Sequence, residues 1–122
     1  MNEGGAMACA AMLLLAAASP VAAEERGVAI HHGFYTGNAY RELPEGQRWT
    51  YVSGVIEGML LAPLYGAPKS KMVWIESCIV GMLDKQVTAI VDKFMAENPA
   101  RWHEDMHALV YSAMIGACKG SP

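Results

Sequence analysis

Residues 103–107 read His-Glu-Asp-Met-His, which is the pattern H-E-x-x-H of the zinc metalloproteases. On a helix, His103 and His107 would lie on one face and could both bind one zinc ion. Glu104 could then polarise a zinc-bound water for attack on a carbonyl group. The pattern therefore raises two alternatives, a zinc hydrolase and a protein without catalytic activity.

Other features of the chain argue against a catalytic zinc site. A zinc enzyme needs a third protein ligand, but residues 108–122 contain no His, Asp or Glu. His31 and His32 lie upstream, in a segment whose position the sequence does not predict. A chain this short can hardly enclose a protease cleft. We therefore predict no enzyme, no catalytic residue, no metal ligand and no cofactor. Incidental or structural metal binding at His103 and His107 stays an alternative.

The first 23 residues have the character of a secretory signal peptide. Residues 7–18 are almost all Ala, Met and Leu, and small residues follow at the positions that flank a cut after Ala23. The apolar run is shorter than the roughly 20 residues that a bilayer core requires, which disfavours a membrane-spanning helix. Signal peptides usually have a positively charged segment before the apolar run, and this chain has none. The first residue of the protein could therefore be Met7, or it could lie upstream of the given sequence.

Removal of residues 1–23 would leave one domain, residues 24–122, in the periplasm. Glu3 is the only charged residue of the leader, so the mature domain keeps a slight excess of acids, and the whole chain has a formal net charge of −3. Nothing in that balance favours nucleic acid or an anionic membrane. We therefore expect no nucleic-acid partner and no membrane attachment after cleavage.

Two cysteines remain in the mature domain, Cys78 and Cys118, because Cys9 would be removed with the leader. In an oxidising compartment an even pair of cysteines is expected to form a disulfide. This bridge would close a loop of about 40 residues, which the chain-entropy model values at roughly 3 to 4 kcal/mol. A free nucleophilic cysteine is disfavoured, since pairing would use both thiols.

Apolar residues recur at spacings of three and four along most of the mature domain, which predicts amphipathic helices. The first long helix should begin near Pro44, because proline suits the first turn. The second should cover residues 84–97 with Asp84 as its cap, and the third residues 103–118. The fold class is therefore a small all-α bundle of three long helices with short helical turns and one disulfide.

The connecting segments are less regular. Residues 27–43 should form an extended arm, a break at residues 36–38 and a short helical turn, and residues 63–70 should form a loop. Residues 72–80 could form a strand fragment or an ordered linker, which the pattern does not separate. Gly54 and Gly58 lie four residues apart on the first helix, and we interpret them as a place where another backbone packs closely.

A series of short motifs follows the chain from Gly33 to Cys118. The second helix ends in an acidic turn, a proline and an arginine, and then His103 and Glu104 open the final helix. Three further motifs precede that helix: Phe34-Tyr35-Thr36-Gly37-Asn38, Tyr51-Val52-Ser53-Gly54, and Cys78-Ile79. In this order and spacing the motifs resemble those of the Tai/Rap immunity proteins. Arg48 and Val80 depart from the family pattern, which often has cysteine and proline there.

This resemblance implies a periplasmic, all-helical, disulfide-bonded protein without catalytic activity. Proteins of that family neutralise cell-wall amidases delivered by type VI secretion, by covering the active-site cleft, often as dimers. By resemblance we expect a secreted peptidoglycan amidase effector as partner, and a homodimer. The competing hypothesis is a stand-alone periplasmic binding or chaperone-like protein, which would use exposed methionine and aromatic residues on several clients.

Three polar-edged aromatic residues near the predicted helix ends are candidate partner-binding residues: Tyr35, Trp102 and His103. Side chains of this kind are often interface anchors. Ordinary packing at helix corners is the more common role of such residues. The sequence leaves both interpretations open.

Overall fold

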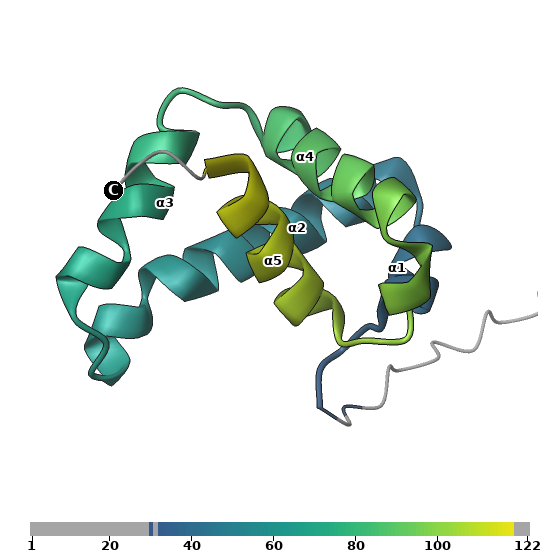
Figure 1. The fold of residues 1–122 in the computed structure, drawn as a ribbon, viewed down its shortest axis with the longest axis horizontal. Helices are drawn as coiled ribbons and strands as arrows, with labels where there is room; N and C mark the ends of the chain where they lie inside the picture. Colours follow the sequence, from purple (N-terminus) through teal and green to yellow (C-terminus); the bar gives the residue numbers. More distant parts are fainter. Residues whose placement is uncertain (1–29, 31, 119–122) are drawn as a thin grey trace, which may run out of the picture.

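The computed structural model describes Ile30 and residues 32–118 (Figure 1). Within these residues the chain is all-α, as predicted, with five α-helices, three short 3-10 helices and no strand. The predicted leader, its cleavage position and Cys9 lie outside the described residues. None of the helices in the described part is long and apolar enough to cross a membrane.

Three longer helices form the body of the molecule: α2 (Glu45–Leu60), α4 (Asp84–Glu97) and α5 (Met106–Cys118). The shorter elements are α1 (Gly37–Arg41), η1 (Ala62–Tyr65), η2 (Lys69–Lys71), α3 (Val73–Ile79) and η3 (Pro99–Arg101). In Figure 1, α1 and α4 lie on one side of α5 and α3 lies on the other. The end of α2 continues into η1 and η2, which project away from α4 before the chain returns along α3.

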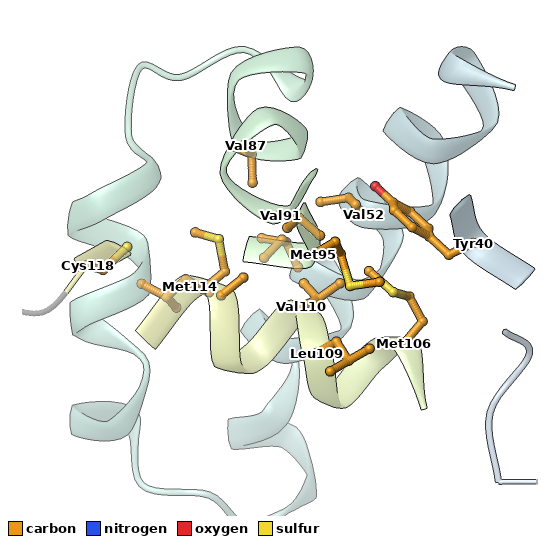
Figure 2. Packing of buried hydrophobic residues seen from close by; sticks show 13 residues of the cluster. Tyr40, Val52, Val87, Val91, Met95, Met106, Leu109, Val110, Met114 and Cys118 are labelled. Atoms are coloured by element: carbon orange, nitrogen blue, oxygen red, sulfur yellow. The ribbon is translucent and has the colours of Figure 1, made fainter. Parts of the chain in front are cut away.

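The helix α5 forms the centre of the hydrophobic core (Figure 2). Its side chains Met106, Leu109, Val110, Ala113 and Met114 are almost fully buried. Residues from the other four α-helices surround them, namely Tyr40, Val52, Ile56, Ile75, Val87, Val91 and Met95. The buried residues of α4 and α5 recur every three or four positions, because one face of each helix must be apolar to pack against the other.

The disulfide between Cys78 and Cys118 is present, as predicted, and its two Cα atoms lie 5.8 Å apart. It joins α3 to the end of α5. With seven residues, α3 is too short to be stable alone in water, so the buried Ile75 and the disulfide must support it. The prediction of a strand fragment or a linker for residues 72–80 is therefore wrong, because tertiary contacts make this segment helical.

The helix α5 begins at Met106, three residues later than predicted. Its start is displaced because the chain before it pairs with a distant segment. The amide of Gly37 donates to the carbonyl of Glu104 at 3.0 Å, and the amide of Met106 donates to the carbonyl of Tyr35 at 2.8 Å. These bonds flank an isolated antiparallel bridge between Thr36 and Asp105. His103 and Glu104 thus lie in a turn and do not open the helix.

Two smaller predictions are also wrong. The N-cap of α4 is Leu83, not Asp84, and the Leu83 amide donates to Oε1 of Gln86 at 2.7 Å. Gly54 and Gly58 have open space where a Cβ atom would be, with no neighbouring atom within 4 Å. No second backbone packs against this side of α2, so their spacing has no packing role within the described chain.

Candidate functional site

The two histidines of the H-E-x-x-H pattern do not share a helix. His103 is exposed in the turn before α5, and His107 is exposed in the first turn of α5. Between them, Glu104 accepts two hydrogen bonds from Arg101, one from Nε to Oε1 and one from Nη2 to Oε2, both 2.7 Å long. The hydrogen bonds from Arg101 lower the pKa of Glu104, so this carboxylate is held as an anion.

This geometry does not support the chemistry that the pattern suggests. A metalloprotease presents both histidines from one helix, with the glutamate free to act on a bound water. Here both oxygens of Glu104 are occupied by Arg101, whose Nη2 also lies 3.3 Å from Oγ of Ser112 on α5. The Arg101–Glu104 ion pair therefore links the turn before α5 to Ser112 on α5. Nowhere in the described chain do three or more His, Cys, Asp or Glu residues form a group that could hold a metal ion.

Residues 35–38 and 102–106 lie side by side, and we call this region the junction. Besides the bridge described above, the amide of Asn38 donates to the carbonyl of Trp102 at 2.7 Å. The indole Nε1 of Trp102 donates to the carbonyl of Met95, also at 2.7 Å. The Arg41 guanidinium covers the indole ring, 3.4 Å from its centroid. The junction thus ties the start of α1 to the end of α4 and the start of α5.

All three predicted partner-binding residues belong to the junction. Tyr35 is half-buried and packs edge-on against Tyr51, with their ring centroids 5.3 Å apart. Burial, and secondarily the charge of Asp105, raises the pKa of Tyr51 to about 12. Trp102 is half-buried under a guanidinium. Tyr35 and Trp102 therefore have packing roles, and only His103 has an exposed side chain.

Gly37 is essential to the junction for a reason that the sequence did not reveal. A Cβ atom at this position would lie 2.9 Å from Cα of Trp102, and equally close to side-chain atoms of Met95 and Leu109. Flexible side chains could move, but the Trp102 contact is with backbone. Glycine lets α1 approach the turn after α4. The sequence indicated only a break in structure here, whereas Gly37 is the first residue of α1.

A polar pocket beside the junction was not predicted from the sequence. It has a volume of about 410 Å³, and its polar and aromatic lining residues are Tyr40, Arg41, Arg48, Asp92 and Trp102, with Met95 and Ala96 as an apolar wall. We call it the Arg48 pocket. The Tyr40 hydroxyl donates to Oδ1 of Asp92 at 2.8 Å, and Nη1 of Arg48 lies 3.7 Å from Oδ2. Its residues come from segments far apart in the sequence, so no motif could have indicated it.

The segment after α2 carries apolar side chains outward, and we call residues 61–73 the apolar arm. Leu64 is 79% exposed and Tyr65 is 87% exposed, and Leu61 and Val73 are each about half exposed. A groove of about 520 Å³ lies between the end of α2 and the start of α3, and Leu60, Leu64 and Met72 are among its lining residues. The sequence indicated only a loop in this region.

No protein-family model matches the chain, and neither a curated protein nor a solved structure matches it. The resemblance to the Tai/Rap proteins thus stays a prediction from short motifs. The junction, the Arg48 pocket and the apolar arm are the features from which a function can be argued.

Proposed function

We propose that this protein is a periplasmic binding protein without catalytic activity, which inhibits a secreted peptidoglycan amidase as the Tai/Rap immunity proteins do. The observation that carries the proposal is the apolar arm. Single exposed apolar residues are normal on a protein surface, but Leu64 and Tyr65 are adjacent and almost fully exposed. Grouped exposed apolar side chains of this kind mark interaction sites.

The backbone of the arm is restrained. Pro63 and Pro68 restrict its backbone, and Gly66 ends η1 in the left-handed conformation, with a φ of 98°. The disulfide fixes α3, which returns the chain to the body. Because a restrained surface loses little conformational entropy on binding, this arrangement favours affinity. Tyrosine is also frequent among the residues that dominate binding energy.

Two basic charges within the arm suit an acidic partner. Lys69 and Lys71 are exposed in η2, next to the apolar side chains. Basic groups around an apolar contact raise the association rate with an acidic surface and fix its orientation. The arm thus carries two lysines, and Glu76 of α3 also lines its groove. A projecting apolar element of this kind could enter the substrate cleft of an amidase and exclude the peptidoglycan.

The remaining features are consistent with this role. The disulfide suits an oxidising compartment such as the periplasm, to which the leader of residues 1–23 would direct the chain. The fixed Glu104 suits a protein that binds an enzyme without being one.

An inhibition assay tests the proposal. The mature protein, residues 24–122, is mixed with secreted peptidoglycan amidases, beginning with any encoded beside its gene, and the release of peptides from purified peptidoglycan is measured. We expect stoichiometric inhibition of one amidase. The double variant Leu64→Ser, Tyr65→Ser should inhibit at least about tenfold more weakly, because it removes the two most exposed apolar side chains of the arm.

Val80→Ser is the matched control for this experiment. Val80 is 81% exposed and apolar, but it follows α3 and lies outside the arm, so its replacement should leave inhibition unchanged. Circular dichroism and thermal unfolding would show that all variants are folded. Absence of inhibition, or equal inhibition by the double variant and the wild type, would contradict the proposal.

The same exposed arm favours the chaperone-like alternative, which a second assay separates. An amidase inhibitor should not prevent the thermal aggregation of two unrelated client proteins. Suppression of both, without inhibition of any amidase, would replace the first proposal with the second. Sedimentation equilibrium of the mature protein tests the predicted homodimer in the same preparation.

A further inference from the structure

We propose that the Arg48 pocket is a binding site for a carboxylate that carries an apolar substituent. This site is separate from the apolar arm, because Arg48 lies in the first turn of α2 and Leu61 follows its last residue. A helix of 16 residues is about 24 Å long, so the two features lie at opposite ends of α2. The proposal does not depend on an amidase partner.

The Arg48 guanidinium has hydrogen-bond donors that nothing in the described chain satisfies. Its Nε is buried and no polar atom accepts its hydrogen. Its Nη1 is 3.7 Å from Asp92, which is close enough for an ion pair and too far for a hydrogen bond. A buried donor without an acceptor costs free energy, so this guanidinium is incompletely paired within the described chain, and an oxygen ligand at its Nη groups would add the hydrogen bonds that Asp92 does not supply.

Asp92 alone does not balance the charge of the pocket. Its Oδ1 already accepts a hydrogen bond from the hydroxyl of Tyr40. Burial, and then the hydrogen bond to Asp92, raises the pKa of Tyr40, so the phenol stays protonated as a donor. The second guanidinium, that of Arg41, has one face covered by Trp102. Its N–H groups therefore remain available to a partner that lies in the guanidinium plane.

The charge and the lining together indicate the class of ligand. Two arginines and one aspartate line the pocket, so one further negative charge makes it neutral, whereas a phosphate dianion would leave an excess. The planar guanidinium also matches the two oxygens of a carboxylate. Met95, Ala96 and the indole of Trp102 supply an apolar wall for the rest of the ligand. The volume lies in the range of roughly 300–1,000 Å³ that is usual for small-ligand sites.

Two sources offer this chemistry, the C-terminal apolar residue of a peptide and a small free acid. Both can be tested by NMR titration of the isotope-labelled mature protein, with N-acetyl-leucine as the mimic of a peptide terminus and hexanoate as the free acid. We expect saturable shifts of the amides of Tyr40, Arg48 and Asp92 with at least one probe. Tighter binding of N-acetyl-leucine assigns the peptide source, and tighter binding of hexanoate assigns the free acid.

Two further probes and four variants make the test decisive. The neutral N-acetyl-leucinamide should not bind, and inorganic phosphate should bind more weakly than the acids. Arg48→Gln should weaken binding by about tenfold or more, because it removes a charged donor, and Arg48→Lys should weaken it less. Arg41→Gln is an independent variant at an exposed position, which keeps the test valid if Arg48→Gln does not fold. Lys93→Gln, on the exposed face of α4 outside the pocket, should bind like the wild type.

The proposal is overturned if neither acid gives saturable shifts. It is also overturned if N-acetyl-leucinamide binds as tightly as N-acetyl-leucine, because the carboxylate would then contribute nothing. Stronger binding of phosphate than of both acids would identify an adventitious ion only. Unchanged affinity in folded Arg48→Gln and Arg41→Gln would place any binding elsewhere on the protein.

Discussion

Near the N-terminal end of α2 the neighbouring segments are joined by hydrogen bonds and stacked rings, whereas beyond its C-terminal end apolar side chains are left exposed. In the junction, the Trp102 indole is bonded to a carbonyl and covered by Arg41. In the apolar arm, the side chains of Leu64 and Tyr65 are mostly exposed. The buried core is formed by residues of all five α-helices and includes neither Leu64 nor Tyr65, so the arm can expose these side chains without weakening the part that holds the fold.

Glycine has opposite roles in the junction and in the middle of α2. In the junction, Gly37 allows a backbone contact that any larger residue would block. On α2, a Cβ atom at Gly54 would meet no atom within 4 Å, so no close approach requires glycine at this position. The comparison therefore predicts opposite effects for the same substitution at the two sites, and the disulfide that holds α3 offers a third test.

Removal of the disulfide should have the largest effect. The double variant Cys78→Ala, Cys118→Ala frees a loop with a sequence separation of 40 residues, which should lower the free energy of unfolding by about 4 kcal/mol. Urea denaturation measures this loss. Hydrogen exchange should also accelerate more in α3 than in α1, because α3 is held by the bridge. Equal acceleration in both helices would contradict the separation of the two regions.

Gly37→Ala should have the next largest effect. Its methyl group would meet the backbone of Trp102, and relieving that contact should lower the free energy of unfolding by about 2 to 3 kcal/mol. Chemical denaturation measures the change. Gly46→Ala is the control, because a Cβ at Gly46 in the first turn of α2 meets no atom within 4 Å. If both variants had the same stability, the close approach in the junction would not matter to folding.

Gly54→Ala should have the smallest effect, with the opposite sign. Alanine fits the open space at this helical position and reduces the freedom of the unfolded chain, so the free energy of unfolding should rise by about 0.5 to 1 kcal/mol. A shift of the denaturation midpoint to higher urea concentration would record it. Destabilisation would mean that this face of α2 is covered by another surface in solution.

The elements with long periodic patterns could be predicted from the sequence. Apolar residues every three or four positions identified α4, and Asn98-Pro99 correctly indicated its end, because the residue before proline avoids the α conformation. The pattern of α3 was too short to identify a helix. Its conformation depends on Ile75 and on the bridge to α5, which are contacts between segments far apart in the chain.

The candidate sites were less predictable than the helices. The H-E-x-x-H pattern indicated chemistry that needs one continuous helix, and the bridge between Thr36 and Asp105 delays the helix until Met106. Tyr35, Trp102 and His103 were singled out one by one as aromatic residues near predicted helix ends, and their proximity to one another came only from the fold. No local sequence pattern could indicate the Arg48 pocket, because its residues approach one another only after α1, α2 and α4 have packed.

The order of amino acids was thus sufficient for the all-α class, the disulfide pair and the longest helices, because helical periodicity and cysteine pairing are local or countable properties of a chain. The tertiary structure decided which surfaces are open and which polar groups have partners. Those properties depend on distances between segments that the sequence keeps apart. For this reason the Arg48 pocket and the apolar arm became visible only in the folded molecule.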